Sequence, residues 1–297
     1  MSSAGVHRRD VPRYLLVVSE PDPVARRVAE RWGTPRPTGE HVDGAAVREL
    51  SAHALMLRRP GPHVHDERLD RRLPPQLIAE GISLVFPSIH RSEQNLPCLT
   101  VHPLGNPGPT AEIGGSPRAL SPTDPGLMVA LLRRMSERAP AIGLRACYES
   151  THHGPWLGLP SLFVEIGYGH LPDPPDEAVK LLSELLPSIE TTAGDRIAVA
   201  VGGGHYAPHF TDLAIRRSWA FGHILSRHAL VGLDGPTAQS AYRLSPGAEG
   251  IVYARAADAE IPAFAGLGPR LRESLAPERS RGGTGGSTDA GRPASGT

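Results

Sequence analysis

Short apolar runs that alternate with helix-start signals constrain the fold of this chain more than any other feature. An Asp-Pro pair occurs three times, at residues 22–23, 124–125 and 173–174. Asp caps the first free backbone N–H groups of a helix, and Pro fits its first turn, so each pair predicts a helix start. Apolar residues at helical spacing, such as Val24 and Val28, support this interpretation. The pattern therefore predicts three capped helices.

The apolar runs between these helices predict buried strands, since many of them are rich in β-branched residues. They cover residues 14–19, 53–57, 82–86, 98–101, 144–148, 161–166, 196–201, 221–225 and 250–254. A last helix is expected near residues 262–275. Strands that alternate with helices predict an α/β fold, with a largely parallel or mixed sheet and helices on both faces.

The chain shows no repeat and no internal linker, so we expect a single catalytic domain over residues 1–277. Residues 278–297 contain no apolar side chain larger than alanine. Such a segment cannot bury enough apolar surface to offset the entropy of ordering, so we expect a disordered C-terminal tail.

Composition excludes several classes of protein. No apolar run approaches the length of a membrane span, and the N-terminal residues lack the apolar core of a secretory signal. The two cysteines, Cys98 and Cys147, are too few for a disulfide framework, so we expect both to be reduced. We therefore expect a cytoplasmic protein that does not enter a membrane.

Arginine supplies almost all of the basic charge, since Lys180 is the only lysine, and the formal net charge is zero. One explanation is the codon bias of a GC-rich genome. The other is phosphate binding through the planar fork of arginine donors. Composition alone favours the first, and a zero net charge gives no strong global field for nucleic acid.

Polar groups that are costly to bury follow several of the predicted strands. They are His90, His102 to Asn106, Glu149 to His153, and Gly202 to His209. Open α/β sheets bind ligands at the edge where the carboxyl ends of their strands meet. We therefore expect these four groups to converge on one site at that edge.

The histidines of these groups suit a metal ion better together than singly. His152 and His153 are adjacent, so both can face one ion only if the chain turns, which the following Gly154-Pro155 permits. His205 and His209 lack the glutamate of a zincin helix. Any one of these histidines alone would more often be a hydrogen-bonded structural residue. With Glu149 and Glu165, however, they form a ligand set that suits zinc.

The triple glycine at residues 202–204 allows two interpretations. Its backbone N–H groups can form a nest for a phosphate or a developing oxyanion. Alternatively, it is a tight turn that allows close backbone packing. The chain has no nucleophile-elbow signature, and the apolar context of Cys147 is unlike that of an activated thiolate.

Several of these segments resemble motifs of the D-aminoacyl-tRNA deacylases of the archaeal and plant type. The motifs are His90-Arg-Ser-Glu93, Leu99-Thr-Val-His-Pro-Leu-Gly-Asn106, Tyr148-Glu-Ser-Thr-His-His-Gly-Pro155, Pro160-Ser-Leu-Phe-Val-Glu-Ile-Gly167, Gly202-Gly-Gly-His-Tyr-Ala-Pro208 and Phe221-Gly-His-Ile224. They occur in the family's order across roughly residues 14–255. The chain departs from the pattern at Tyr168-Gly169, where a small polar residue is expected, and at Gln94-Asn95, which replaces a glycine.

The resemblance implies an enzyme that hydrolyses the ester between a D-amino acid, such as D-tyrosine, and tRNA. Proteins of this family are described as zinc-dependent monomers, so the implied cofactor is Zn²⁺ and the implied substrate is D-aminoacyl-tRNA. The implied fold is similar to that of nucleoside phosphorylases and peptidyl-tRNA hydrolases. L-aminoacyl esters would be rejected by steric exclusion from a rigid pocket.

The resemblance and the residue chemistry together indicate a set of site residues. The catalytic candidates are Glu149, His152, His153, Glu165 and His205, and the expected zinc ligands are His152, His153 and His205. The substrate-binding candidates are His90, Ser92, His102, Asn106, Gly202, Gly203, Gly204 and Tyr206. The glycines would hold the oxyanion or the terminal adenosine. Sequence leaves open whether Glu149 or Glu165 binds zinc or acts as general base.

Two other kinds of function remain open. One is a metallopeptidase or a nucleoside-phosphorylase-like hydrolase on a similar sheet. The other is a tRNA-binding module without chemistry, which would need basic groups but not the paired histidines. The candidate phosphate contacts are the arginine pairs at residues 26–27, 58–59, 71–72 and 133–134.

Overall fold

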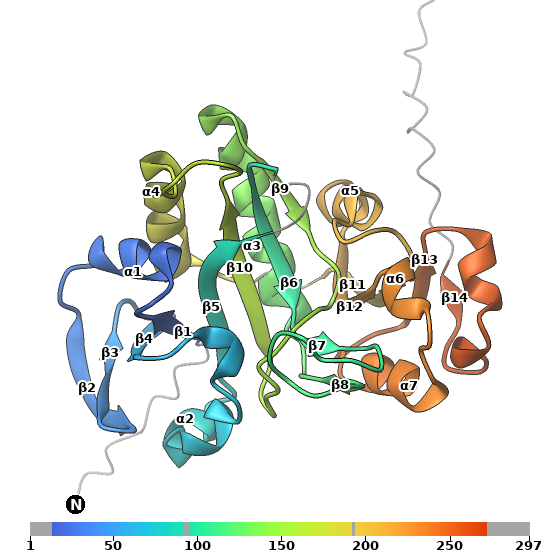
Figure 1. The fold of residues 1–297 in the computed structure, drawn as a ribbon, viewed down its shortest axis with the longest axis horizontal. Coiled ribbons are helices and arrows are strands. Elements are labelled where there is room, and N and C mark those ends of the chain that lie inside the picture. The colour runs from blue at the N-terminus through green and yellow to red at the C-terminus, as the bar shows by residue number, and fades with distance from the viewer. Residues whose placement is uncertain (1–13, 92–95, 192–193, 272–297) are drawn as a thin grey trace, which may run out of the picture.

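The computed structural model describes residues 14–91, 96–191 and 194–271, and these form an α/β structure with two principal sheets (Figure 1). The larger sheet contains β1 (Tyr14–Ser19), β2 (Arg36–Val42), β3 (Ala45–Glu49), β4 (Ala54–Arg59), β5 (Ser83–His90), β6 (Cys98–Pro103), β9 (Arg145–Tyr148) and β10 (Ser161–Gly167). The smaller contains β11 (Arg196–Val201), β12 (Trp219–Leu225), β13 (Gly250–Tyr253) and β14 (Arg270–Leu271). A short hairpin joins β7 (Gly105–Asn106) to β8 (Ala119–Leu120). The α/β fold class predicted from the sequence is confirmed.

The larger sheet is mixed, with the strand order β2-β3-β4-β1-β5-β10-β6-β9. Strands β4, β1, β5 and β10 are parallel, whereas β6 runs antiparallel to β10 and parallel to β9. The smaller sheet is parallel throughout, in the order β12-β11-β13-β14. The strands expected in one sheet are thus divided between two.

Seven α-helices connect the strands: α1 (Pro23–Glu30), α2 (Pro75–Ala79), α3 (Pro125–Arg138), α4 (Asp176–Leu185), α5 (Pro208–Arg216), α6 (Arg227–Leu230) and α7 (Gly235–Arg243), counted over the described residues. Short 3₁₀ turns lie at His63–His65, Leu69–Arg72, Ala139–Ile142, Leu186–Ser188, Ala256–Glu260 and Pro262–Phe264. Within the described ranges, no helix has both the length and the apolar character that crossing a bilayer requires.

Two of the three predicted helix caps are confirmed. The carboxylate of Asp22 accepts the backbone N–H groups of Val24 and Ala25, and that of Asp124 accepts the N–H of Leu127. The third prediction is wrong, because α4 begins three residues after Asp173. A residue that precedes proline is disfavoured in the helical region, and two consecutive prolines therefore delay the helix.

The helix predicted near residues 262–275 is wrong over residues 262–271, and residues 272–275 lie outside the described part of the chain. The structure has a 3₁₀ turn at Pro262–Phe264, followed by the short strand β14. Gly266 has a φ of 75°, a left-handed conformation that ends regular helix, and Pro269 removes a backbone donor.

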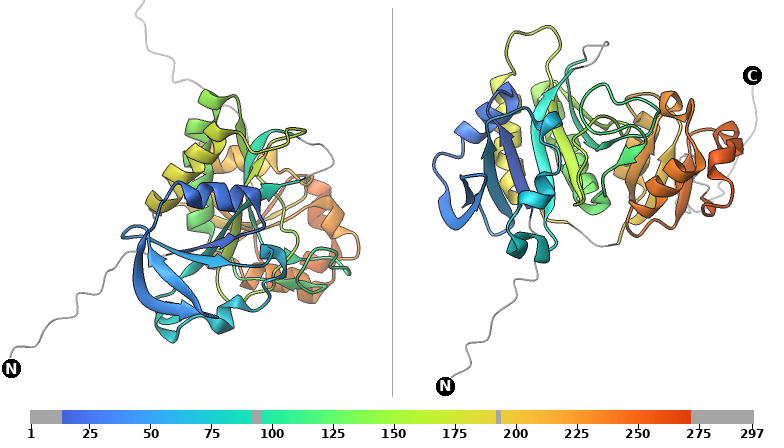
Figure 2. Two further views of the ribbon diagram at one scale, coloured as in Figure 1. Left: turned by 60° about the vertical axis from the view of Figure 1, so that its left-hand side comes forward. Right: turned by 60° about the horizontal axis from the view of Figure 1, so that its bottom comes forward.

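Side chains of the inner strands β1, β4, β5, β10 and β6 are buried on both faces, which explains their nearly continuous apolar runs, whereas the edge strand β2 is largely exposed. Leu16 of β1 lies in the core beneath α1, α3 and α4, whereas Leu15 and Val17 lie in the core of the opposite face. Helix α2 contributes Leu77 to that second core. Figure 2 shows α1 and α4 side by side on one face of the larger sheet.

Helix α3 links the two sheets. It packs against β6 and β9 of the larger sheet and against β12 of the smaller one. Its residue Met128 belongs to the same apolar cluster as Phe221 of β12 and Leu162 of β10. The two sheets therefore share one core, which fixes the loops that follow β9 and β11 relative to each other.

Arg133 on α3 should contribute more to stability than its neighbour Arg134. Its guanidinium forms two bonds to Asp195, of 2.8 and 2.7 Å, and also contacts the carbonyl of Ala214. The Asp195 side chain is only 10% exposed, so Arg133→Met would leave a nearly buried carboxylate unpaired. We expect the free energy of unfolding, measured by urea denaturation, to fall by about 2 kcal/mol.

The matched control is Arg134→Met on the same helix. That arginine is 60% exposed and pairs only with the exposed Glu137, so a change within about 0.5 kcal/mol is expected. Equal losses in the two variants would show that the Arg133–Asp195 pair has no special role.

Candidate active site

The histidines and carboxylates predicted as a site come together on one face of the larger sheet. Phe163 and Glu165 are two residues apart on β10 and therefore point to the same face. His102 of β6 pairs across from Phe163, and its ring stacks on that side chain with centroids 5.3 Å apart. His90, at the end of β5, pairs across from Gly167.

The expected location at a common carboxyl edge is wrong. Because β6 runs antiparallel to β10, its carboxyl end lies beside the start of β10, not beside its end. The site instead extends along the sheet face, between His102 near one edge and His90 near the other. The convergence of the segments is real, but its geometric reason differs from the one inferred from sequence.

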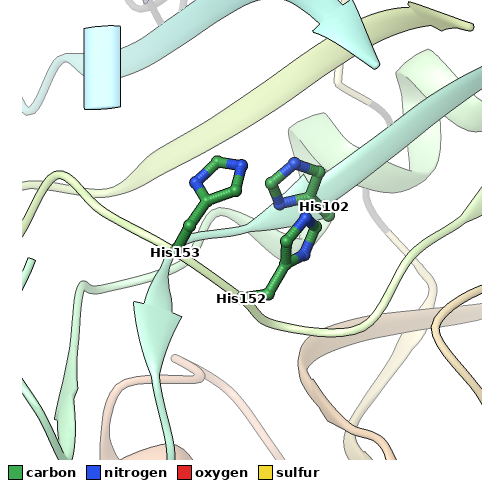
Figure 3. Close-up of side chains that lie close together, drawn as sticks. All are labelled: His102, His152 and His153. Carbon is green, nitrogen blue, oxygen red and sulfur yellow. The ribbon is translucent and has the colours of Figure 1, made fainter. Parts of the chain in front are cut away.

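The loop after β9 supplies the adjacent histidines by turning sharply. His153 has a φ of 43°, a left-handed conformation that a non-glycine residue adopts at a cost of roughly 1–3 kcal/mol. The turn places the rings of His152 and His153 with their centroids 4.4 Å apart. The His102 ring lies 4.1 Å from that of His152 and 5.0 Å from that of His153, and Figure 3 shows the three together.

Each of these three imidazoles is oriented by a backbone carbonyl. Nδ1 of His152 lies 2.7 Å from the carbonyl of Ser150, and Nδ1 of His153 lies 2.8 Å from that of Gly154. Nδ1 of His102 lies 3.2 Å from the carbonyl of Pro103. A carbonyl only accepts, so each Nδ1 carries a proton, and in the neutral ring Nε2 keeps a lone pair. This arrangement is typical of metal-binding histidines.

Glu149 stands at the centre of a second group. It is fully buried, and Oε1 lies 3.0 Å from Nδ1 of His90. Oε2 lies 2.9 Å from Nε2 of His205 and 3.7 Å from Nε2 of His152. Burial disfavours the charged carboxylate, but its contacts with His205 and His90 outweigh this and hold the pKa of Glu149 well below its usual range.

Glu165 is a second buried carboxylate, only 3% exposed. Its Oε2 accepts a 3.0 Å bond from Nδ1 of His90, and its Oε1 lies 3.7 Å from Nε2 of His102. Burial lowers the pKa of His90, but the two carboxylates raise it overall to about 10. In contrast, burial and the neighbouring His102 lower the pKa of His153 to about 4.

The polar atoms at the centre of the cluster are poorly satisfied. Both oxygens of Glu149 and Nε2 of His102 and of His205 are buried without an aligned hydrogen bond among the described residues. Buried polar atoms rarely stay unpaired. These residues therefore fit a cation that would take several lone pairs at once.

Three sets of side chains bring their ligand atoms within 4.8 Å of one another. They are His102–His152–His153, His90–Glu149–His205 and His102–Glu149–Glu165. The trio predicted from sequence, His152, His153 and His205, is divided between the first two sets. His90 and His102 also belong to these groups, and their predicted contact with substrate stays a prediction.

The triple glycine makes a turn that brings His205 and Tyr206 to Glu149. Gly202 has a φ of 106°, its N–H donates to the carbonyl of Leu225, and a side chain there would collide with Asp258. The N–H of Gly202 is therefore not available to an oxyanion. This favours a tight turn over an anion-binding nest at Gly202. Neither Gly203 nor Gly204 lines the two pockets at the cluster, so their substrate contact stays a prediction.

The other residues singled out from the sequence lie at different distances from the cluster. The hydroxyl of Tyr206 lies 2.8 Å from Nε2 of His90, which places it beside the cluster. Asn106 donates to the carbonyl of Gly114 and lines a pocket. Ser92 lies outside the described residues. His209 belongs to α5, where its ring contacts Phe210.

Two pockets meet at the cluster. The first has a volume of about 520 Å³ and reaches Ser19, Asp22 and His63, and the second has a volume of about 420 Å³ and reaches Thr110 and His228. Sequence reasoning assigned none of these five residues to the site. Asp22 was interpreted only as a helix cap, a role it has through Oδ1, while its Oδ2 accepts bonds from Ser88 and Ile89 at the end of β5.

Most of the arginine pairs predicted as phosphate contacts are occupied by carboxylates. Arg59 bonds to Asp43 and Asp66, and Arg58 bonds to Glu20. The other internal pairs are Arg26–Glu30, Arg27–Asp176, Arg72–Asp66, Arg133–Asp195 and Arg134–Glu137. This weakens their case as phosphate contacts.

The two cysteines are free thiols, as the sequence predicts. Burial raises the pKa of Cys98 to about 12 and raises that of Cys147 as well. Both therefore stay protonated near neutral pH and are poor nucleophiles.

His223, which lies next to the cluster, should make stability depend on pH. Its side chain is fully buried, and its Nδ1 lies 3.1 Å from Oγ1 of Thr151. Burial lowers the pKa of His223 from 6.5 to about 3. Between these values the unfolded chain binds a proton that the folded chain does not, so stability falls as the pH falls through this window. His223→Gln should flatten the slope of unfolding free energy against pH, from pH 6 to 4, by up to about 1.4 kcal/mol per pH unit.

His65→Gln is the control for this measurement. That side chain is exposed, so its replacement should leave the slope of the wild-type chain unchanged. The slope, not the absolute stability, is the test, because His223→Gln also alters packing. If both variants keep the wild-type slope, His223 is not held neutral by burial.

Comparison with known proteins gives this geometry a context. Residues 80–261 match a family model described as D-aminoacyl-tRNA deacylase. Proteins named D-aminoacyl-tRNA deacylase align with the chain at 35% identity over 172 residues in Thermoplasma acidophilum, 40% over 178 residues in Methanosphaerula palustris and 37% over 171 residues in Pyrococcus abyssi. These alignments cover 58, 59 and 56% of this chain, and 67, 38 and 62% of the respective relatives.

A solved structure has a similar fold. A crystal structure described as a conserved protein of unknown function superposes with a TM-score of 0.74 at 26% identity, covering 87% of this chain and 94% of the other. The family match spans more than half of the chain and includes both carboxylates and every histidine of the cluster. The chain therefore belongs to the D-aminoacyl-tRNA deacylase family.

Proposed function

We propose that this protein hydrolyses the ester bond between a D-amino acid and tRNA. The observation that carries the proposal is the buried Glu149 carboxylate, which faces the imidazoles of His90, His152 and His205 with neither oxygen in an aligned hydrogen bond. A carboxylate held ionised among imidazoles can take and return protons during ester hydrolysis. Membership of the deacylase family supports this reaction, and the printed names of the relatives support this substrate.

We further propose that the site uses zinc. His102, His152 and His153 would hold it, because their Nδ1 atoms contact backbone carbonyls and a possible ligand atom of each lies within 4.8 Å of those of the other two. Burial, followed by repulsion from neighbouring histidines, lowers the pKa of His152 and His153, so both are neutral and able to bind a metal at pH 7. When bound, zinc supplies a Lewis acid that polarises the ester and lowers the pKa of water.

This ligand set replaces the one expected from sequence, in which His205 was the third ligand. His205 instead contacts Glu149, and its side chain is 38% exposed, whereas Glu149 is buried. We assign Glu149 as the general base for the attacking water. His205, at the boundary with solvent, would return the proton to the departing ribose oxygen. His90 orients Glu149 and is itself held by Glu165 and Tyr206.

The preference for D over L esters would come from steric exclusion. Part of the wall around the cluster is held by hydrogen bonds, because the carboxylate of Asp22 accepts bonds from α1 through Oδ1 and from the end of β5 through Oδ2. A rigid wall can reject one enantiomer because it cannot move to accept the other. D-tyrosine is one substrate to test, and a monomeric, cytoplasmic enzyme is the expected form.

Replacing Glu149 or His205 should abolish the reaction without abolishing the fold. We expect Glu149→Gln and His205→Ala to lower kcat for D-tyrosyl-tRNA by roughly 10²–10⁴-fold, since each removes a proton carrier. The double variant should be little worse than either single one, because the residues act as a unit. The rate of D-tyrosine release from charged tRNA is the measurement, with circular dichroism as the check on folding.

His209→Ala is the matched control, since it removes a histidine of the same segment whose ring contacts only Phe210 in the described structure. It should keep nearly full activity. Equal losses in all three variants would contradict the assignment of Glu149 and His205. A wild-type chain that releases no D-amino acid from any tRNA tested would overturn the proposed function itself.

Metal removal tests the zinc proposal separately. A chelator should abolish hydrolysis by the wild-type chain, and added Zn²⁺ should restore it. His153→Ala should lower zinc affinity, measured by calorimetry, by at least about 100-fold, whereas His209→Ala should not change it. Full activity of a folded, metal-free chain would exclude zinc and leave Glu149 and the histidines to activate water unaided.

A further inference from the structure

The two pockets at the cluster share only two wall residues among those described, His152 and His205. Each pocket has a volume within the roughly 300–1,000 Å³ typical of small-ligand sites. An aminoacyl ester has two unlike halves, a nucleoside and an amino acid, joined at the bond to be broken. Two pockets that meet at the catalytic groups match this division, so the question is which pocket takes which half.

One part of the first pocket's wall offers apolar contact. Val64 and Ile113 contribute apolar surface there, and Pro62 also belongs to the lining. Two polar groups of the lining are satisfied within the protein, because both oxygens of Asp22 accept bonds from it and Nε2 of His63 accepts the N–H of Ser19. This part of the wall suits an amino-acid side chain, whereas Arg91 and the cluster residues line the rest of the pocket.

The second pocket has a different chemistry. Hydroxyl, amide and imidazole groups of Asn106, Thr110, Ser226 and His228 alternate with apolar surface, and Val231 at its rim is 75% exposed. Such a mixture suits a nucleoside, whose ribose hydroxyls and base edges need hydrogen-bond partners and whose base needs a flat apolar contact.

The charged groups of the two pockets also differ. The first includes the carboxylates of Asp22 and Glu165 together with the guanidinium of Arg91 and the imidazole of His90, whereas the described lining of the second contains neither a carboxylate nor an arginine. The positively charged α-amino group of the ester would be attracted toward the carboxylate of Glu165 in the first pocket. The exposed Arg227 follows Ser226 and has no carboxylate partner among the described residues.

We propose that the pocket of Asn106, His228 and Val231 binds the 3′-terminal adenosine of tRNA, and that the pocket of Val64 and Ile113 binds the amino-acid side chain. This assignment rests on the proposed deacylase function. It places the ester beside His152 and His205, where the pockets meet. It also predicts that Val64 and Ile113 determine which amino acids are accepted, whereas His228 and Val231 affect all substrates alike.

The test compares D-tyrosyl-tRNA with D-alanyl-tRNA, whose amino-acid side chains are a large phenol and a small methyl group. Ile113→Trp and Val64→Phe narrow the first pocket, so kcat/KM for D-tyrosyl-tRNA should fall by at least about tenfold relative to D-alanyl-tRNA. Ile113 is 53% exposed, so its replacement is compatible with folding. The control is Ile78→Trp on α2, also a partly exposed isoleucine, which lines neither pocket and should leave the ratio unchanged.

The second pocket is tested by Val231→Asp and His228→Ala. Each should lower kcat/KM for both substrates by a similar factor, about tenfold, and leave their ratio unchanged. Adenosine 5′-monophosphate gives a reading that does not depend on catalysis. Its binding to the wild-type chain, measured by calorimetry, should weaken in these two variants and not in Ile113→Trp.

Each outcome has a distinct meaning. Wild-type hydrolysis of both substrates, with the ratio changed by Val231→Asp and not by Ile113→Trp, would reverse the assignment and overturn this proposal while leaving the deacylase function intact. If Ile113→Trp abolished the binding of adenosine monophosphate, the pocket assignment would likewise be overturned. A wild-type chain that hydrolyses neither substrate would instead overturn the proposed function.

Discussion

The arrangement of the site depends on a few backbone hydrogen bonds that join the two sheets. The N–H of Ser150 donates to the carbonyl of His205, that of Ala207 to Tyr148, and that of Thr151 to Ile224 of β12. These bonds pair the loop after β9 with the loop after β11, and so place Glu149 beside His205. Glu149 follows a strand of the larger sheet and His205 follows a strand of the smaller one, so their contact depends on this pairing of the loops. Helix α3 stabilises the pairing by packing against both sheets.

The consequence of this pairing is an unusual density of buried charge. Glu149 and Glu165 lie in one ligand group with His102, and two ionised carboxylates so close together need compensating positive charge. In a metal-free site, protons on His90 and His102 supply this positive charge: burial lowers the pKa values of both imidazoles, but the carboxylates raise them overall. In a metal-bound site, a divalent ion would supply the positive charge and would bind the lone pairs that make no hydrogen bond. The same cluster is therefore suited to proton transfer and to metal binding.

The cluster also divides the surrounding space. His152 and His205 form a boundary shared by two pockets, one that contains carboxylates and an arginine and one whose polar groups are mainly hydroxyl, amide and imidazole groups. A substrate whose two halves differ in polarity can then be oriented by the pockets alone, before any contact at the bond to be cleaved. Orientation of this kind brings the reacting groups together at low entropic cost once the substrate is bound.

The sequence by itself determined the α/β class, two of the three helix caps and nine of the fourteen strands of the described residues, because apolar periodicity and caps are local signals. The strands β2, β3, β7, β8 and β14 were not predicted, because they are short or carry few buried apolar side chains. It also identified Glu149, Glu165 and the histidines as an unusual group, because such residues are costly to bury. Only the tertiary structure decided which of them share a ligand group. Strand direction placed His102 opposite Phe163, and the left-handed turn at His153 brought adjacent rings together. Sheet pairing and pocket walls join residues far apart in the chain, so no local pattern encodes them.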